Sequence, residues 1–374
     1  MPPWRRGLPA EPLRFGLIGV GVGARQLLPA LTSGANARLV AAADVRVDAV
    51  DALARKYGLR GYASAEALLG DPEVEAVWVA TPNHLHAEHS IAALQAGKHV
   101  IVSKPMAITR QESAAMIRAA RGNGVHLLAG HTQSLAPSIR TMASMVQSGE
   151  LGKLGMLHTW HFTDWMYRPR LPAELDVAQG GGPVFRQASH QVDIVRSIAA
   201  SPVRSVRASV VQLDGRRGAP GAYTAFLEFA SGVPATLVYS GYGHFAMDEL
   251  VGREVHRSPA VEDDVAAKEA LRNSPTGSNS LGLFGLTLVS CERGDLRESP
   301  EGLVLYERDA RRVISVADEP RGAAELEELY DAVRLGQPLT HDGEWGQATL
   351  DVCLAIHESA RIGTEIQFEE MRLC

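Results

Sequence analysis

The sequence predicts an α/β protein that begins with a doubly wound parallel sheet and continues into a second domain rich in strands. The 374 residues are enough for about two domains, each with its own core. Short apolar runs alternate with amphipathic stretches between residues 14 and 130. This alternation is typical of βαβ units, whose helices cover both faces of a parallel sheet. From residue 202 to 316 the pattern is mostly that of strands.

The first domain, residues 13–135, follows a tail at residues 1–12 that we expect to be flexible. Its expected helices cover residues 47–57, 84–96 and 109–121. Thr109 and Glu112 form a capping box at the start of the last of these, because their side chains can satisfy the first free N–H groups of a helix. The expected strands cover residues 15–20, 38–43, 75–81, 99–102 and 125–129.

The second domain, residues 136–374, surrounds the strand-rich stretch with helices, and its last helix can pack back on the first domain. A hairpin is expected around Gly232, because glycine supplies the positive φ that such turns need. Residues 247–280 are polar, so we expect a long loop that acts as a lid. The expected helices are 137–147, 184–198, 323–335 and 343–361, and the expected strands are 154–163, 223–229, 233–240, 283–290, 303–307 and 313–316.

Composition and charge exclude several classes of protein. The chain has 37 Lys and Arg against 43 Asp and Glu and no basic stripe, so we expect neither a nucleic acid nor a membrane surface as partner. No apolar run approaches the ~18 residues of a membrane span. The three cysteines form no CxxC pair, which argues against a disulfide framework or a thiolate zinc site. We expect a cytoplasmic protein without a metal; Trp4-Arg5-Arg6 lacks the apolar segment of an export signal.

A glycine-rich turn follows the first expected strand. Gly19-Val20-Gly21-Val22-Gly23-Ala24 fits G-x-G-x-x-G/A, in which the first glycine allows a tight turn and the second lets the backbone approach a pyrophosphate. Asp44 ends the second strand, where a carboxylate binds the ribose hydroxyl groups of adenosine. Together they predict a Rossmann dinucleotide site. Asp44 would repel the 2′-phosphate of NADP and favours NAD, although Arg46 could pair with that phosphate.

Two further clusters follow parallel strands, whose carboxyl ends form the ligand-binding edge of such a sheet. We expect Thr81, Pro82, Asn83 and His86 to contact the cofactor; turn formation by Pro-Asn is the alternative. Lys104 follows the next strand, and only five lysines occur among the 37 basic residues. Because a partly buried lysine can exchange a proton and arginine cannot, Lys104 is a candidate catalytic and cofactor-binding residue, with a surface lysine as the alternative.

A third constellation follows three consecutive glycines at residues 180–182. Arg186 and His190 are four residues apart on one helix face, and Asp193 lies where it can orient the His190 ring. His190 and Asp193 are therefore candidate catalytic residues. Ahead of the glycines, aromatic residues beside arginines could grip an aromatic or anionic substrate, or belong to a solvated loop. The candidates there are Trp165, Tyr167 and Arg168.

These motifs resemble those of the Gfo/Idh/MocA oxidoreductase family over residues 14–368. The matching residues are Gly19-x-Gly21-x-x-Ala24, Asp44, Thr81-Pro82-Asn83-His84-x-His86, Ala96-Gly97-Lys98-His99-Val100, Lys104-Pro105 and His190-x-x-Asp193. Further stretches resemble the group of phthalate 4,5-cis-dihydrodiol dehydrogenases, among them Gly130-His131-Thr132, Tyr167-Arg168-Pro169-Arg170 and Tyr239-Ser240-Gly241-Tyr242.

The resemblance implies a Rossmann domain and a substrate-binding and oligomerisation domain with a large, mostly antiparallel open sheet, in a homodimer or homotetramer. It implies that NAD lies between the domains, that Lys104 and His190 are catalytic, and that His131 contacts the substrate. Two residues depart from the family pattern: Ser103 replaces a glutamate, and Arg186 replaces an aspartate four residues before His190. Because Arg186 offers a planar fork suited to a carboxylate, we expect an anionic, cyclic small-molecule substrate.

We therefore expect an NAD-dependent dehydrogenase that oxidises a secondary alcohol, such as a carboxylated cis-dihydrodiol that becomes a catechol in aromatic catabolism. Lys104 and His190 would move the hydroxyl proton, and Asp193 would position His190. The alternatives are a sugar or cyclitol dehydrogenase, a non-catalytic dinucleotide-binding regulator, and a redox-neutral enzyme that keeps its NAD bound. NADP is the less favoured cofactor.

Overall fold

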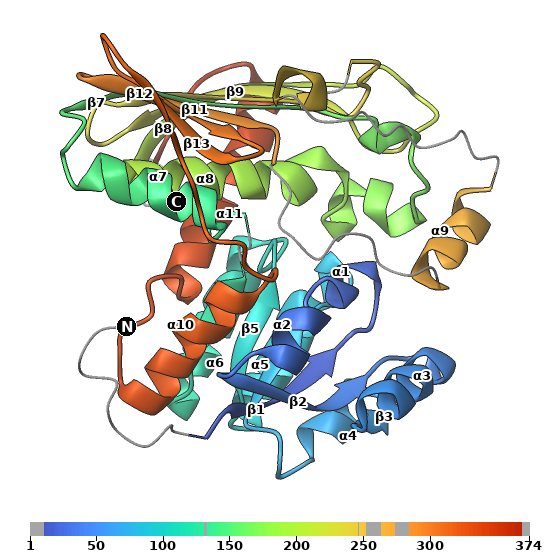
Figure 1. Cartoon of the computed structure of the whole chain (residues 1–374). Coiled ribbons are helices and arrows are strands. Elements are labelled where there is room, and N and C mark those ends of the chain that lie inside the picture. The colour runs from blue at the N-terminus through green and yellow to red at the C-terminus, as the bar shows by residue number, and fades with distance from the viewer. Residues whose placement is uncertain (1–10, 131–132, 246, 252–262, 274–283, 369–374) are drawn as a thin grey trace.

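The computed structural model describes residues 11–130, 133–245, 247–251, 263–273 and 284–368. Two sheets form two layers, with helices packed between and around them (Figure 1). The first sheet is parallel and the second is mostly antiparallel. This architecture confirms the predicted fold class.

The first sheet has the strand order β3-β2-β1-β4-β5-β6, and its strand pairs are parallel. Every residue of β4 is buried, as expected for a continuous apolar run that is covered on both faces. The winding reverses at β1, and ligands of such sheets bind at the carboxyl ends of the strands there. The strands are β1 (Leu13–Ile18), β2 (Ala37–Ala43), β3 (Arg60–Tyr62), β4 (Ala76–Val79), β5 (His99–Ser103) and β6 (Leu127–Gly130).

The helices of this half are α1 (Val22–Arg25), α2 (Leu28–Ser33), α3 (Val47–Tyr57), α4 (Ala65–Leu69), α5 (His86–Gln95) and α6 (Arg110–Asn123). The start of α6 confirms the capping box. The Thr109 hydroxyl accepts from the Glu112 N–H at 3.2 Å, and the Glu112 carboxylate accepts from the Thr109 N–H at 3.0 Å. β3 and α4 have no counterpart among the predicted elements, because such short segments show no periodic pattern.

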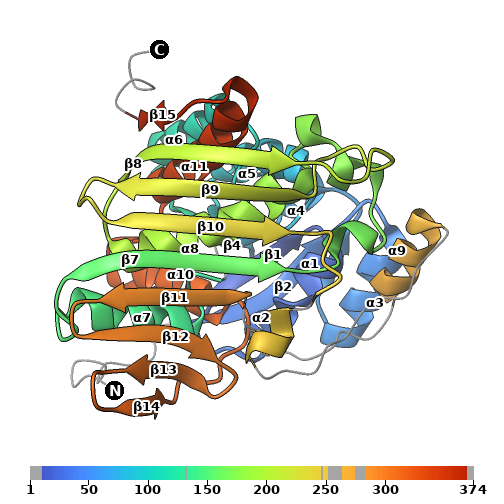
Figure 2. The same cartoon turned by 90° about the horizontal axis from the view of Figure 1, so that it is seen from above.

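Among the described residues the second sheet has nine strands, in the order β14-β13-β12-β11-β7-β10-β9-β8-β15. β7 and β10 are parallel, while β9, β11 and β12 pair antiparallel with their neighbours. Helices α7 and α8 lie under the sheet in Figure 1, and Figure 2 looks onto its other face. The strands are β7 (Leu154–Phe162), β8 (Val203–Val211), β9 (Ala222–Phe229), β10 (Pro234–Ser240), β11 (Leu286–Cys291), β12 (Gly294–Ser299), β13 (Gly302–Tyr306), β14 (Arg311–Ile314) and β15 (Ile366–Gln367).

The helices of the second half that pack on the sheets are α7 (Pro137–Gln147), α8 (Ser189–Ala199), α10 (Ala323–Leu335) and α11 (Gly343–Ile362). α10 packs against α2, while α11 contacts α6 and β6 on one side and β8 on the other. The last helix therefore does pack back on the first sheet. None of the helices in the described part of the chain is long and apolar enough to cross a membrane.

Two predicted elements differ from the structure. Within the predicted loop 247–280, the described residues form a 3-10 turn (Met247–Val251) and α9 (Asp264–Asn273), so the prediction of one continuous loop is wrong there. α9 contains good helix formers such as Ala and Lys, which a reading of polarity alone passes over. The predicted helix 184–198 begins with a π-helical turn (Val184–Ala188), which directs Val184 into the core of the second sheet and Phe185 into that of the first.

Candidate active site

The glycine-rich turn connects β1 to α1 at the carboxyl end of the first sheet. Gly19 has a φ of +92°, and a Cβ added there would lie 2.8 Å from the Ala80 carbonyl oxygen, so the turn requires glycine. A Cβ added at Gly21 or Gly23 meets nothing within 4 Å. The backbone there faces open space, as the close approach of a pyrophosphate requires. The other predicted residues of the turn, Val20, Val22 and Ala24, are buried or half-buried.

Asp44 follows β2 and faces the same turn. Its carboxylate accepts from the Val20 N–H at 2.8 Å and from the Arg46 N–H at 3.0 Å, and the Arg46 Nε lies 3.2 Å away. Burial raises the pKa of Asp44, but these hydrogen bonds and the Arg46 charge outweigh burial and hold the pKa below its ordinary value. Arg25, which the sequence analysis did not single out, lies close enough to Arg46 for their charges to repel. The carboxylate is thus ionised beside a pair of arginines.

Hydrogen bonds of Asn83 and His86 hold the loop after β4 in place. The His86 ring nitrogens lie 2.7 Å from the Pro105 carbonyl oxygen and 2.8 Å from that of Thr81. Burial above all lowers the pKa of His86 to about 4, so its ring is neutral and donates to one of these oxygens. Asn83 Nδ2 donates to the Gly180 carbonyl oxygen at 2.7 Å, which ties the loop to the glycines before α8. Thr81 and Pro82 thus lie at the strand end, while His86 and Asn83 hold the loop in place.

Lys104 directly follows β5, and its Nζ donates to the Arg186 carbonyl oxygen at 2.6 Å. Burial is the largest cause that lowers the pKa of Lys104, to about 7, and the charges of Arg186 and Arg321 lower it further. An amine with this pKa exchanges a proton near neutral pH, which is what a general base or acid needs. Arg321 lies just before α10, far along the chain, so sequence reasoning had no signal that it approaches Lys104.

A buried carboxylate, Glu174, gathers three cations, and one of them, Arg186, accepts the Lys104 hydrogen bond at its carbonyl oxygen. Glu174 accepts from Arg186 at 3.0 Å, its second oxygen lies 3.1 Å from Lys268 Nζ on α9, and Arg170 lies 3.6 Å away. With one carboxylate for three cations, this cluster carries a net positive charge. The cations also outweigh burial and keep the pKa of Glu174 below its ordinary value. Neither Glu174 nor Lys268 is among the predicted residues, although the scarcity of lysine that marked Lys104 applies equally to Lys268.

The predicted pair on α8 is buried. The His190 ring packs on Phe284, with 4.7 Å between ring centroids. Asp193 accepts from the Trp345 Nε1–H at 2.6 Å and the Thr349 hydroxyl at 3.0 Å, both on α11, and from the Ser134 hydroxyl. Asp193 therefore ties α8 to α11, and its orientation of His190 stays a prediction.

The predicted aromatic and arginine residues before the glycines make three separate contacts. Trp165 is buried, and the Arg170 guanidinium lies 3.9 Å above its ring, so Trp165 supports a member of the Glu174 cluster. Arg168 Nε donates to the Asp164 carboxylate at 2.6 Å. Tyr167 stacks on His244 and is 37% exposed. His131 lies outside the described residues.

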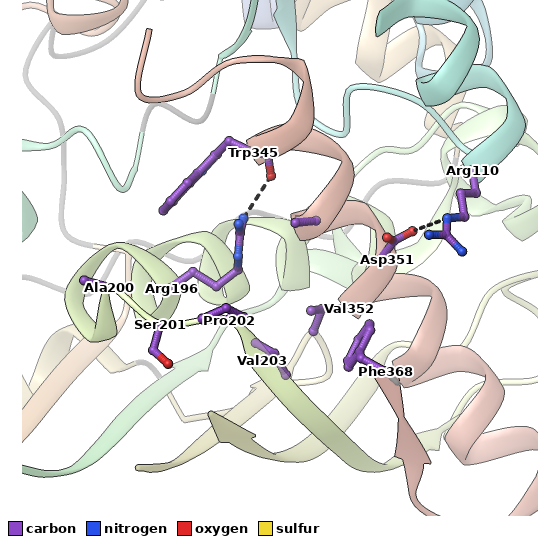
Figure 3. Close-up of a pocket in the computed structure, with 11 residues that line it drawn as sticks. Arg110, Arg196, Ala200, Ser201, Pro202, Val203, Trp345, Asp351, Val352 and Phe368 are labelled. Carbon is purple, nitrogen blue, oxygen red and sulfur yellow. Dashed lines mark hydrogen bonds and ion pairs between the residues drawn. The ribbon is translucent and has the colours of Figure 1, made fainter. Parts of the chain in front are cut away.

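Two cavities lie apart from these residues. One, of about 360 Å³, is bordered by α6, α8 and α11, and Figure 3 shows Arg196 and Trp345 on one side of it and Arg110 and Asp351 on another. The other, of about 330 Å³, is lined by Gln133, Glu298 and Phe284, among others. Lys104 and His190 line neither cavity, although Phe284 separates the second cavity from the His190 ring.

Together these features bring a dinucleotide-binding turn, a lysine that titrates near neutral pH and a net-positive cluster to the carboxyl end of the first sheet. The arrangement can take a proton from a hydroxyl group and hold an anion beside it.

Both halves of the chain match models of one family. Residues 13–131 match the GFO/IDH/MocA model of an oxidoreductase family with an NAD-binding Rossmann fold. Residues 139–251 match the GFO/IDH/MocA C-terminal domain.

Known proteins are similar over most of the chain. A 1-carboxy-3-chloro-3,4-dihydroxycyclohexa-1,5-diene dehydrogenase from Comamonas testosteroni is 33% identical, over 93% of this chain and 95% of the relative. An inositol 2-dehydrogenase from Saccharopolyspora erythraea is 30% identical, over 64% of this chain and 71% of the relative. The solved structure of a dehydrogenase from Bordetella bronchiseptica is 33% identical, with a TM-score of 0.86, and covers 95% of this chain and 100% of its own.

Proposed function

The chain belongs to the Gfo/Idh/MocA family of NAD-binding oxidoreductases, and from this premise we propose that it oxidises a carboxylated ring with two cis-vicinal hydroxyl groups. The observation that carries this proposal is the partly buried, net-positive cluster of Arg186, Lys268 and Arg170 around Glu174, which Arg186 links to Lys104 through its backbone carbonyl oxygen. The Comamonas relative, whose name describes a carboxylated dihydroxycyclohexadiene, supports the same substrate class.

The proposed reaction oxidises one of the two hydroxyl groups. Bound NAD supplies the hydride acceptor for the C–H bond of that carbinol. Lys104 takes the hydroxyl proton, for which a pKa of about 7 suits it, and buried His190 assists the transfer. The hydroxyketone then becomes a catechol when the proton on the other carbinol carbon moves to the new carbonyl oxygen.

The residues around the glycine turn favour NAD over NADP. The open side of Gly21 suits the pyrophosphate, and ionised Asp44 suits the ribose hydroxyl groups. Arg46 already pairs with Asp44, so its guanidinium is less available to a 2′-phosphate. Arg25 favours NADP instead, because it adds a second cation close to Arg46.

The Glu174 cluster supports an anionic substrate. Buried charges are costly unless they are paired, and this cluster has more cations than carboxylates. A substrate carboxylate would supply the missing counter-charge, with the Arg186 fork as its main partner. The runner-up function is a cyclitol or sugar dehydrogenase, which the inositol relative favours; a neutral substrate would leave the excess charge without a partner.

We also propose a cytoplasmic homodimer or homotetramer. Cys291 and Cys353 are free thiols, which suits a reducing compartment. The outer face of the second sheet supports self-association, because it exposes large apolar side chains.

The proposal is tested by following nicotinamide reduction with NAD⁺ and NADP⁺ in parallel. The substrates are cis-3,4-dihydroxycyclohexa-1,5-diene-1-carboxylate, the same ring without the carboxylate, myo-inositol and glucose. We expect NADH from the carboxylated diol, and a loss of roughly 10²- to 10⁴-fold in kcat for Lys104→Ala. Lys153→Ala is the matched control, because Lys153 is exposed and should leave the rate unchanged.

A second variant separates the substrate class from the reaction class. Arg186→Ala should raise KM for the carboxylated diol roughly 10-fold or more and leave KM for the uncarboxylated diol nearly unchanged. Equal effects on both diols would contradict the assignment of Arg186. Turnover of inositol or glucose alone would keep the dehydrogenase and replace the proposed substrate by the runner-up.

A further inference from the structure

Two polar side chains meet at the carboxyl ends of β7 and β10. These strands are parallel, and their register places Tyr239 directly opposite His161. The two rings meet edge to face, with centroids 5.6 Å apart. Thr159 and Leu237, two residues earlier on the same strands, are fully buried, so His161 and Tyr239 belong to the covered face of the sheet.

One polar side-chain atom of each residue has no hydrogen-bond partner in the part of the chain that the structure describes. Tyr239 is 1% exposed, and its hydroxyl has no hydrogen-bond partner among the described residues; the same holds for His161 Nδ1. The neighbouring Tyr223 provides the contrast. Its ring stacks on Tyr239 at 5.6 Å, yet its hydroxyl donates to Gln191. A buried hydroxyl group without a hydrogen-bond partner destabilises a folded protein. Its presence at Tyr239 therefore suggests a role in binding a ligand.

The pair lies between the catalytic histidine and the arginines that precede the glycines. Phe284 packs on His161 at 4.5 Å and on His190 at 4.7 Å, so a single ring separates the two histidines. On the other side, the charges of Arg170 and Arg168 act on the Tyr239 hydroxyl. The Tyr239 hydroxyl therefore lies within reach of the charges of these arginines and, through His161 and Phe284, close to the His190 ring.

We propose that the Tyr239 hydroxyl and His161 bind the second hydroxyl group of the substrate, the one that is not oxidised. The inference rests on the proposed function and assigns residues to a group that Lys104, His190 and the Glu174 cluster leave unbound. Burial, with the charge of Arg168, lowers the pKa of His161 to about 4, so its ring is neutral at physiological pH. A neutral imidazole and a phenol both donate and accept, which matches an uncharged hydroxyl better than a carboxylate.

The test uses two readouts on Tyr239→Phe, which removes only the hydroxyl. The first is the Tm of the protein without substrate, which should rise by roughly 1–3 °C because an unsatisfied buried group is removed. The second is binding of 3,4-dihydroxybenzoate, 3-hydroxybenzoate and 4-hydroxybenzoate to the NADH-loaded enzyme by calorimetry. The variant should bind the dihydroxy compound roughly 3- to 10-fold more weakly and at least one monohydroxy compound with unchanged affinity.

Tyr223→Phe is the matched control. Because the Tyr223 hydroxyl is already satisfied, this variant should lower the Tm and leave the ratio of the three affinities unchanged. His161→Leu should weaken binding of the dihydroxy compound as Tyr239→Phe does, whereas His161→Asn, which keeps a donor near Nδ1, should restore part of the affinity.

The outcomes separate this inference from the proposed function. If the wild-type enzyme prefers 3,4-dihydroxybenzoate and Tyr239→Phe keeps that preference, the proposed substrate stands and this inference is wrong. A fall in Tm for Tyr239→Phe would also overturn it, because the hydroxyl would then be satisfied within the protein. If the wild-type enzyme binds none of the three benzoates, the proposed substrate class is wrong and the second-hydroxyl assignment fails with it.

Discussion

At the scale of single residues, Lys104 owes its chemistry to neighbours that are distant in the chain. Burial lowers its pKa most, followed by the charges of Arg186 and Arg321. Arg321 precedes α10, whose buried Leu326 and Leu329 belong to the core of the first sheet. Arg321, which lies just before α10, thus helps to lower the pKa of Lys104, the candidate base.

This dependence predicts a shifted pH profile for Arg321→Gln. Removing a nearby positive charge stabilises protonated Lys104, so its pKa rises and the base form appears only at higher pH. The acidic limb of kcat/KM should therefore move to higher pH, and at pH 6 the value should fall roughly two- to fivefold. The measurement is a pH profile of kcat/KM with the carboxylated diol. Arg312→Gln, an exposed change on β14, should leave the limb in place; a limb that moves to lower pH would contradict the argument.

Sequence reasoning found Lys104 because lysine is rare in this chain and because the residue follows a strand of the parallel sheet. Lysine rarity marks Lys268 as well. Because Lys268 lies in a polar stretch far from any glycine turn or strand end, the sequence did not indicate that it would form an ion pair at the site. Glu174 gathers partners that are 12 and 94 residues away, and no local pattern encodes such contacts. The charged groups around Lys104 could therefore be identified only from the structure.

At the scale of elements, two ion pairs attach the described side chains of α9 to the rest of the molecule. Arg217 pairs with Asp264 at its first residue, and Lys268 reaches Glu174 from its middle. Ion pairs of this kind contribute on the order of 0.2–1 kcal/mol each when exposed, and more when shielded as Lys268 is. α9 is therefore an element whose docking responds to the charge of the site beneath it.

We predict that the double variant Arg217→Ala/Lys268→Ala releases α9. Amide hydrogen exchange within residues 264–273 should become roughly two- to tenfold faster, because both attachments are removed, while exchange in α6 stays unchanged. Arg216→Ala is the control, since Arg216 is exposed and pairs with neighbouring Asp214. Unchanged exchange in α9 would show that other contacts hold it.

Elements with strong local signals were predictable, and short or polar ones were not. α3, α7 and α10 have the predicted bounds, because apolar periodicity and the glycines that end α3 and α10 act within each segment. β8 and β12 were missed as individual strands, since buried polar residues, Ser205 in β8 and Glu298 and Ser299 in β12, interrupt their apolar pattern. The π-helical turn before α8 places neighbouring side chains in two different hydrophobic cores. A sequence pattern with the period of an α-helix does not predict such a turn.

At the scale of the whole molecule, the outer face of the second sheet exposes several large apolar side chains. Met156 and Phe226 are each 44% exposed and Trp160 is 37% exposed, on strands near the centre of the sheet in Figure 2. Patches of this kind mark association surfaces. Because an isologous contact pairs the same face of two copies, this face suits a two-fold interface.

Trp160→Glu should therefore dissociate the proposed homo-oligomer. A charge at the centre of each apolar face would be buried without a partner in the assembly, so the variant should sediment as a smaller species, down to the 40.1 kDa monomer. Analytical ultracentrifugation of the wild type, Trp160→Glu and Leu213→Glu decides the matter. Leu213 is 70% exposed and lies outside the strands, so its change should preserve the assembly. A monomeric wild type would contradict the proposal.

The two-layer architecture was predictable because alternation of strands with helices and a hairpin signal are properties of neighbouring residues. The contacts between the layers were predictable only in part: the sequence predicted that the last helix can pack back on the first domain, but the charges that meet across the molecule, such as Arg321 near Lys104, had no local signal. The division of the chain at residue 135 stays a prediction, and both C-terminal helices share contacts with the first sheet.

The attachment of Asp193 to α11 has a consequence for how the protein is made. The donors that surround this carboxylate, Trp345 and Thr349, are synthesised more than 150 residues after it. In a nascent chain that already contains Lys104, Glu174 and His190 but not α11, Asp193 lacks these two hydrogen bonds. We therefore expect activity only after α11 has been synthesised and has left the ribosome. An incomplete chain should not reduce NAD⁺.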